Sequence, residues 1–319
     1  ETVGLLDLSW RRAVCITGSE RIQFLHSMTT NHVLNLGPGL AQHTTCCDVT
    51  GHLVGTLRLV NRGDSIWADM HPGCADDVLA ILDKHLIMED VEITPTPDWT
   101  VLSLQGPLWR SALSKAVGRD ILSPPPLHVV GYNLEEKPLD GVTDSHTGAP
   151  GIDLFVSVDK IAHLWEVLTD AVQQVGGRPV GMDALRTLRV EAGIPWWGED
   201  LDHSLLMLEA GLEDSIHFEK GCYLGQETLA RVHFRGHTNR QLMGLRLPGG
   251  ELPPPGAGLS AGERPAGRIT TAVFSPGMNE AIALGFVRRE FLAPGTVLSV
   301  GESGAEAVVT GLPFVKTET

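Results

Sequence analysis

"WRRAVCITGSERIQFLHSM", residues 10–28, has a counterpart later in the chain, "WTVLSLQGPLWRSALSKAV", residues 99–117. In each stretch a short apolar run predicts a strand, and a glycine follows it, Gly18 in the first and Gly106 in the second. Apolar residues at helical spacing come next, so each strand is expected to lead into a helix. The two stretches therefore indicate an internal repeat within the first 240 residues.

Each copy continues with further strands and a second helix. In the first copy, "LVGTLRLV" (53–60) and "SIWADM" (65–70) predict strands, residues 75–86 predict a helix, and "VEIT" (91–94) predicts a closing strand. In the second copy, "LFVSV" (154–158) predicts a strand and residues 160–175 a helix. The order β-α-β-β-α-β is that of a ferredoxin-like domain. The sequence thus predicts two such halves, residues 1–97 and 98–240.

The pattern changes after residue 240. "LMGLRLPGG", "RITTAVF", "AIALGFV" and "TVLSVG" are short strand-like runs separated by turns rich in glycine and proline. Strands at this spacing are typical of a small antiparallel barrel or sandwich. A third domain is therefore expected over residues 241–319, and the fold class is α+β.

Composition restricts the kinds of partner. The chain has 319 residues, 42% of them hydrophobic and 20% charged, with a net charge of −15. This charge disfavours nucleic acid and anionic lipid as main partners, and no apolar run of about 18 residues predicts a membrane-spanning helix. Five cysteines, an odd number without a C-x-x-C motif, make a disulfide scaffold improbable and favour a reducing compartment. The start at Glu1 fits removal of a leader.

One cysteine, Cys222, lies in the polar stretch "FEKGCYLGQETLARVHFRGHTNR", residues 218–240. A thiol becomes reactive where a cation, a helix N-terminus or backbone N–H groups favour the thiolate. This stretch offers candidates for all three, and the pattern predicts a nucleophile or a ligand for a soft metal. The alternative is a small buried residue in a tight turn. The expected neighbours of the thiol in this site are Lys220, Gly221, Gly225, Gln226, Glu227 and Arg231.

The other cysteines show weaker signals. Cys15 alternates with apolar residues in a strand and is expected in the core. Cys46 and Cys47 are adjacent, so in a strand they point to opposite faces and form a poor chelating pair. Cys74 follows a Pro-Gly pair, where a surface or partly buried position is expected.

A second polar stretch, "MDALRTLRVEAGIPWWGEDL" (182–201), begins with a predicted helix. Arg186 and Glu191 lie on it, and Trp196 and Trp197 follow. These residues suit either a solvated helix with ordinary ion pairs or the wall of a pocket for a polar, planar ligand. The sequence alone leaves both open.

Four segments together resemble a known family. "GLLDLS" (4–9), "ALRTLRVEAGIPWWGEDL" (184–201), "KGCYLGQE" (220–227) and "ITTAVFSPGMNEAIALGFV" (269–287) are similar to the tetrahydrofolate-binding aminomethyltransferase superfamily. "KGCYLGQE" resembles its YgfZ-type branch, and in particular the mitochondrial member that acts late in iron–sulfur cluster assembly. The resemblance implies two interlocked ferredoxin-like domains and a C-terminal antiparallel β-barrel, arranged like a clover around a central cavity that holds folate in the enzymes. It also implies the mitochondrial matrix as location.

One departure from the family bears on the reaction. Aminomethyltransferases carry an acidic pair in a segment resembling "N-E-x-G-G-x-x-D-D", and its aspartate orients the transferred group. The matching segment here is "CCDVTGHLVGTLRLV" (46–60), and with Gly51 as anchor the pair falls on Gly55 and Thr56. Neither residue is a carboxylate, so the resemblance does not extend to aminomethyl transfer.

The function expected from these observations is an iron–sulfur assembly factor in the maturation of [4Fe–4S] proteins. A [2Fe–2S] cluster needs four ligands, and this chain offers one suitable thiol, Cys222. The resemblance implies that an A-type carrier protein supplies the others in a heterodimer, while Lys220, Arg231 and glycine N–H groups offset the charge of the cluster. The alternatives are a folate-dependent one-carbon transferase and a regulatory protein that binds tetrahydrofolate.

Overall fold

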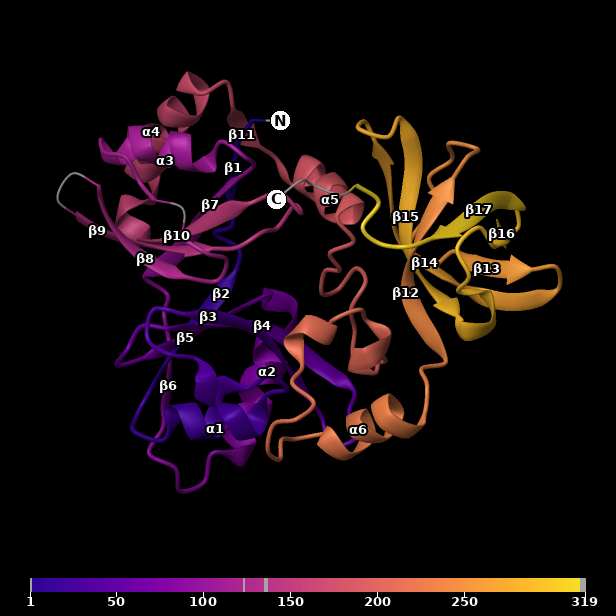
Figure 1. Ribbon diagram of the computed structural model, residues 1–319, viewed down its shortest axis with the longest axis horizontal. Helices are drawn as coiled ribbons and strands as arrows, with labels where there is room; N and C mark the ends of the chain where they lie inside the picture. Colours follow the sequence, from indigo (N-terminus) through magenta and orange to yellow (C-terminus); the bar gives the residue numbers. More distant parts are fainter. Residues whose placement is uncertain (1, 123, 135–136, 316–319) are drawn as a thin grey trace.

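A computed structural model describes residues 2–122, 124–134 and 137–315. It has three lobes, two built on β-sheets with helices and one β-barrel, and helix α5 (Met182–Glu191) lies between them (Figure 1). The predicted α+β class with a C-terminal barrel is confirmed. The chain ends of the expected first and third domains, residues 1 and 316–319, lie outside the described residues.

The first lobe contains a five-stranded antiparallel sheet in the order β3-β4-β5-β2-β6. Without β3, this is the order of a ferredoxin-like domain. Alternation turns Val14 and Ile16 of β2 toward the helices, where both are buried. Its elements are β2 (Arg12–Thr17), α1 (Arg21–Met28), β3 (Ala41–Cys47), β4 (Leu53–Asn61), β5 (Ile66–Met70), α2 (Pro72–His85) and β6 (Glu92–Pro95).

The second lobe contains a six-stranded sheet in the order β11-β1-β7-β10-β9-β8. Strand β1, from the N-terminus of the chain, pairs with β7 antiparallel and with β11 parallel. It fills the position of the fourth ferredoxin strand, so the two lobes are interlocked. The elements are β1 (Gly4–Asp7), β7 (Trp99–Gln105), α3 (Trp109–Val117), β8 (Val129–Leu134), β9 (Lys137–Thr143), β10 (Gly151–Ser157), α4 (Ile161–Gln174) and β11 (Arg178–Val180).

The third lobe is a closed six-stranded barrel in the order β12-β15-β14-β13-β16-β17. Alternate residues point inward and form a separate core that includes Leu245, Ile269 and Val309. Its strands are β12 (Arg240–Leu247), β13 (Gly258–Ala261), β14 (Arg264–Ser275), β15 (Glu280–Arg288), β16 (Val297–Val300) and β17 (Ala305–Thr310).

Residues 192–239 connect α5 to the barrel and cover the first lobe. They include helix α6 (Gln226–Arg235) and short 3-10 turns at Met207–Glu209 and Glu213–Ser215. The largest apolar core joins Leu25 of the first lobe, Leu229 of α6 and Phe286 of the barrel, whereas the second lobe has an apolar core of its own. None of the helices in the described part of the chain is long and apolar enough to cross a membrane.

Candidate functional site at the junction of the lobes

A buried arginine on β4 links the first two lobes. Alternation along β4 turns Gly55 toward α2, where its neighbours are Val78 and Cys74, and places Arg58 on the opposite face, toward the second sheet. Arg58 is 1% exposed. Its NH2 donates to Asp69 of β5 at 2.7 Å. The other terminal nitrogen of Arg58, NH1, bonds carboxylates of the second lobe.

Arg58 NH1 donates to Asp144 at 2.8 Å and to Asp153 of β10 at 2.6 Å. Burial opposes ionisation of Asp153, but His146, at 2.8 Å, and Arg58 outweigh it and hold the pKa of this carboxyl well below its ordinary value. Asp144, His146 and Asp153 have ligand atoms within 4.8 Å of one another, the spacing of a metal site. Arg58 bonds both carboxylates, so the chain itself already supplies the compensating positive charge.

Three aromatic rings from different segments meet beside this network. Trp10, between β1 and β2, contacts His71 at 5.1 Å and Trp196 at 6.0 Å between ring centroids. His71 precedes α2, and Trp196 follows α5. Nε1 of Trp10 is buried and has no hydrogen-bond partner among the described residues. The rings therefore provide apolar faces together with one unused N–H donor.

Charged residues of α5 lie next to Trp196. Arg189 is fully buried, its guanidinium is 5.0 Å from the Trp196 ring, and it bonds Glu199, Asp200 and Thr271 of β14. Arg186, which is half-exposed, donates through Nε to Glu199 at 3.0 Å. The solvated-helix interpretation is thus wrong for Arg189, because this side chain is buried and bonds α5 to Thr271 of the barrel.

The expected pocket wall is only partly assembled. Glu191 turns toward the barrel, where Ser275 Oγ donates to its Oε1 at 2.5 Å, so it is not the partner of Arg186. Trp197 is buried in the main core and contacts His203, and Trp196 is the tryptophan of this pair that meets Trp10. Of these three side chains, Glu191 therefore faces the barrel, Trp197 the main core and Trp196 the junction.

The positions of the missing acidic pair differ in their surroundings. A Cβ on Gly55 would overlap Val78 Cγ2 and come within 3.1 Å of Cys74 Sγ, because α2 packs directly on this strand. Thr56 is half-buried and lies on the same strand face as Arg58, which is the face toward the second lobe. Only the second position therefore faces the junction.

Cys222 is exposed, as a reactive thiol requires. Cys46, Cys47 and Cys74 are buried, which corrects the expected partly exposed position of Cys74, and burial raises the pKa of Cys47 to about 12. Cys15 is half-buried rather than a core residue. Exposure therefore distinguishes Cys222 from the other four thiols.

Lys220 does not accompany the thiol. Its side chain is 5% exposed, and its Nζ donates to the carbonyl oxygens of His26, Thr29 and Asn31, at the end of α1. Burial lowers the pKa of Lys220 to about 8. The expectation that this cation supports a thiolate or a cluster is wrong, because the ammonium satisfies helix-end carbonyls instead.

The glycines of the loop have different roles. Gly225 has a φ of +81° and precedes α6, and a Cβ there would be 2.5 Å from the carbonyl oxygen of Asp48. Gly221 does not have a positive φ. Helix α6 begins at Gln226, so Cys222 lies in the loop that precedes the helix.

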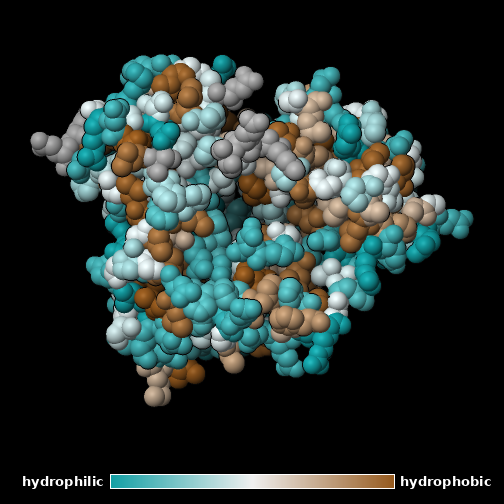
Figure 2. Space-filling model, in the orientation of Figure 1, coloured by the Kyte–Doolittle hydropathy of each residue, from teal (hydrophilic) through white to brown (hydrophobic). Residues whose placement is uncertain are grey.

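The remaining predicted residues extend from α6. Glu227 in its first turn and Arg231 in its middle are exposed, and Gln226 is half-buried. These residues belong to the surface around Cys222 and not to the aromatic junction. The sequence-predicted residues thus fall into two groups, one on α5 and one on the Cys222 loop. Figure 2 shows a hollow in the middle of the face where the three lobes meet.

Sequence reasoning missed the residues that the tertiary structure brings to the junction, namely Trp10, His71, Arg58, Glu199 and the acidic partners of Arg58. Trp10 and Trp196 are 186 positions apart. They carry no common motif, and a tryptophan next to two arginines, at residues 10–12, was the only local signal.

Known proteins are similar to this chain over nearly its full length. Residues 1–220 match the GCVT N-terminal domain, and residues 240–316 match the glycine cleavage T-protein C-terminal barrel domain. An aminomethyltransferase of Rubrobacter xylanophilus is 30% identical over 98% of this chain and 83% of its own length. An aminomethyltransferase of Bacillus subtilis is 27% identical over 98% of this chain and 88% of its own length.

A solved structure has the same fold. The glycine cleavage system aminomethyltransferase T of Bartonella henselae superimposes with a TM-score of 0.89 at 21% identity, covering 99% of this chain and 87% of that one. The closed barrel of strands β12 to β17 lies within the residues that match the C-terminal barrel domain. The chain therefore belongs to the glycine cleavage T-protein family of aminomethyltransferases.

Proposed function

We propose that this chain binds tetrahydrofolate at the junction of its lobes and acts as a folate-dependent one-carbon transferase. The observation that carries the proposal is the ring cluster of Trp10, His71 and Trp196, with the unpartnered Nε1 of Trp10. A pterin is planar and rich in hydrogen-bond acceptors, so it can pack against these rings and accept from the indole N–H. The residues present therefore fit the cofactor.

Charged groups beside the rings suit the same ligand. Arg186 is half-exposed and has donors left after its bond to Glu199. Glu199 also forms an ion pair with Arg189, so two arginines hold its carboxylate in one orientation. Bound tetrahydrofolate would supply the nitrogen atoms that carry a one-carbon unit, and the chain would bind and orient the pterin. The proposal does not include aminomethyl transfer, since Gly55 and Thr56 offer no carboxylate.

Calorimetric titration with 5-formyltetrahydrofolate, a stable folate, tests this site. We expect saturable binding to the unaltered chain and at least tenfold weaker binding to Trp196→Ala, because a stacking face is lost. Trp99→Ala is the matched control, since Trp99 contacts Trp67 and not the junction. Absence of binding to the unaltered chain, or equal weakening by both substitutions, would contradict the proposal.

A second candidate function rests on the exposure of Cys222. We propose that this chain belongs to the YgfZ-type branch and acts in the mitochondrial matrix. In this function Cys222 is its one ligand to a [2Fe–2S] cluster that is shared with an A-type carrier. Lys220 takes no part, since it is bound to the end of α1. Arg231, exposed on α6, is the remaining cation of the motif.

Mixing the chain with a cluster-loaded A-type carrier under anaerobic conditions tests this second function. Size-exclusion chromatography with visible spectra should show a coloured heterodimer for the unaltered chain and none for Cys222→Ser, because a hydroxyl is a poor iron ligand. Cys74→Ser is the matched control: it should lower the melting temperature, since it places a hydroxyl in the core, yet keep the complex. A heterodimer with unchanged spectrum from Cys222→Ser would exclude this cysteine as ligand.

A further inference from the structure

A pocket lies where the chain passes from α6 into β12, beside the end of β15 (Figure 1). Its volume of about 560 Å³ is within the range of about 300–1,000 Å³ that is usual for small-molecule sites. Neither Cys222 nor the rings of the proposed folate site line it. The described residues that line it are all polar, namely His237, Asn239, Arg240, Arg288, Arg289 and Glu290.

Two arginines lie opposite each other on the strands beside this pocket. Arg240, the first residue of β12, is paired in antiparallel register with Arg288, the last residue of β15. Residues directly opposite in such a pair have their side chains on the same face of the sheet. Like charges in this arrangement repel each other and destabilise the pair. A bound anion would therefore remove an electrostatic cost that the free chain carries.

Arg240 is held in one orientation, and part of its guanidinium is free. Its Nε donates to Glu209 at 3.1 Å, and its NH2 donates to the carbonyl oxygen of Ser204 at 3.0 Å. The guanidinium also lies 5.4 Å from the centroid of the Phe286 ring. Its NH1 makes no hydrogen bond to the described residues. Because the side chain is already ordered, it can donate from NH1 to a ligand with little further loss of entropy.

The other two arginines of the pocket have no carboxylate partner. Arg288 and Arg289 are exposed, and neither side chain forms an ion pair with the described part of the chain. Glu290 is the acidic residue among those that line the pocket, and its oxygen lies 3.9 Å from Arg264. The whole chain has 39 acidic and 24 basic residues, so adjacent unpaired arginines beside a third are a local reversal of charge. Such a concave basic site attracts an anion from solution.

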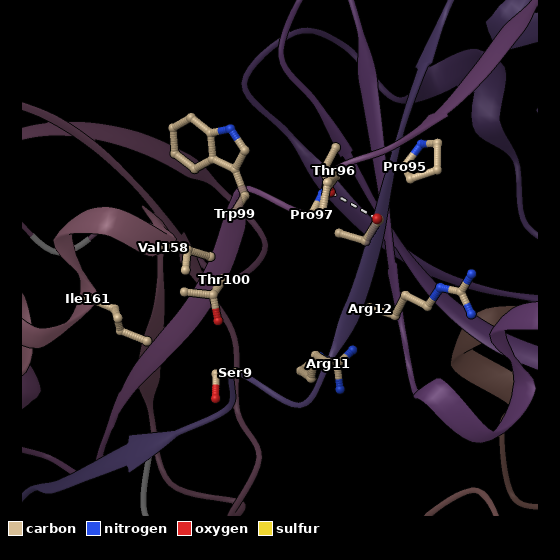
Figure 3. A pocket seen from close by; sticks show the side chains of 11 residues that line it. Ser9, Arg11, Arg12, Pro95, Thr96, Pro97, Trp99, Thr100, Val158 and Ile161 are labelled. Carbon is tan, nitrogen blue, oxygen red and sulfur yellow. Dashed lines mark hydrogen bonds between the residues drawn. The ribbon is translucent and has the colours of Figure 1, made fainter.

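A different hollow with two arginines, between the two sheeted lobes, lacks this property (Figure 3). Arg11 there bonds both oxygens of Asp69, at 2.8 and 3.1 Å. Arg12 pairs with Asp76 and points away from the space in Figure 3. Carboxylates of the chain itself thus neutralise both cations, which leaves the pocket beside β12 and β15 as the stronger candidate for an anion.

We propose that the pocket beside β12 and β15 binds a small oxyanion with at least two negative charges. Arg288 and Arg289 bind its oxygen atoms, and NH1 of Arg240 adds a donor from the base of the pocket. Guanidinium groups match the oxygens of both phosphates and carboxylates, so the ligand is a polyphosphate or a polycarboxylate. The site is separate from the proposed folate site and from Cys222, and its test needs no catalytic activity.

Calorimetric titrations of the full chain with pyrophosphate and with citrate, at low salt, test the proposal. We expect saturable binding of at least one of them, and at least about tenfold weaker binding of acetate, which has a single charge. Tighter binding of pyrophosphate would identify a phosphate ligand, and tighter binding of citrate a carboxylate ligand. No saturable heat with either anion, or binding of acetate with equal affinity, would overturn the proposal.

Three variants locate the site. Arg288→Gln should bind the preferred anion at least about tenfold more weakly, at an unchanged or higher melting temperature, because it also removes the repulsion from Arg240. Arg289→Gln should bind about three- to tenfold more weakly. Glu290→Gln should bind about twofold or more tightly, since it removes a negative charge from the lining of the pocket.

Arg246→Gln is the matched control, because Arg246 lies on the same strand β12 and pairs with Glu280, and its loss changes the net charge by the same amount. Its affinity should change less than about twofold. Unaltered binding by both Arg288→Gln and Arg289→Gln would overturn the proposed site. A loss in Arg246→Gln equal to that in Arg288→Gln would mean that the anion responds to net charge alone, and would overturn it as well.

Discussion

Asp153 of β10 accepts a hydrogen bond of 2.6 Å from NH1 of Arg58 on β4, and the two residues belong to different sheets. Both side chains are fully buried, and Arg58 also bonds Asp69 and Asp144. The contact therefore holds the two sheeted lobes together beside the proposed folate site.

Arg58→Met should lower the free energy of unfolding by about 3–5 kcal/mol, because it leaves buried carboxylates without their cation. Urea unfolding followed by circular dichroism measures this change. Arg246→Met is the matched control, since Arg246 forms a half-exposed pair with Glu280 and its loss should cost less than about 1 kcal/mol. Equal costs for the two substitutions would mean that the buried network is not stabilising.

The acid stability of the fold should depend on the same network. The folded-state pKa of Asp153 lies below its ordinary value, so in acid the unfolded chain binds more protons than the folded one. The stability that Asp153 contributes is complete above the unfolded pKa of about 3.9 and is lost as the pH falls below it. In Arg58→Met this loss should be smaller, as measured by urea unfolding at a series of pH values. If the free energy of unfolding falls as much in acid for Arg58→Met as for the unaltered chain, this pH dependence does not come from the Arg58 network.

The unaltered chain should not transfer an aminomethyl group from an aminomethyl-lipoyl donor to tetrahydrofolate. The resemblance to aminomethyltransferases implies a carboxylate in this reaction at a position where this chain has Gly55 and Thr56. Mass spectrometry of the lipoyl donor after incubation measures the transfer. Stoichiometric turnover would show that this chain catalyses the reaction without the acidic pair.

Restoring a carboxylate should have very different costs at the two positions. Gly55→Asp should destabilise the fold by more than about 3 kcal/mol, because the new side chain overlaps Val78 and buries a charge under α2. Thr56→Asp, on the half-buried face toward Arg58, should cost less than about 1.5 kcal/mol. Thermal melts compare the two, and similar melting temperatures would contradict the packing argument.

Cys222 should react with iodoacetamide at neutral pH much faster than Cys47. Cys222 is exposed, whereas burial raises the pKa of Cys47 to about 12. Tryptic mass spectrometry after timed labelling of the folded chain gives the two rates. Equal or slower labelling of Cys222 would show that the loop is closed over the thiol.

Lys220→Met should lower the free energy of unfolding by about 1–3 kcal/mol, because three carbonyl oxygens at the end of α1 lose their donor. The labelling rate of Cys222 should stay within about twofold of the unaltered rate, since the ammonium points away from the loop surface. A large fall in that rate without loss of stability would instead make Lys220 the activator of the thiol.

Local pattern was sufficient for much of the fold. Val14 and Ile16 alternate with half-buried residues in β2, and the helices after Gly18 and Gly106 follow from apolar spacing. The β-α-β-β-α-β order and a C-terminal barrel or sandwich follow from this pattern, whereas the family follows from the resemblance of four sequence segments. The sequence did not indicate that β1 would complete the second sheet, because strand pairing depends on non-local packing.

The candidate sites depended more strongly on tertiary contacts. The sequence by itself determined that Cys222 lies in a glycine-rich loop, that Gly225 can take a positive φ, and that Gly55 and Thr56 replace an acidic pair. The tertiary structure alone decided that Lys220 serves α1, and that Arg58 meets Asp153 and Trp10 meets Trp196. The physical reason is that the direction of a long polar side chain is set by buried partners that are distant in sequence.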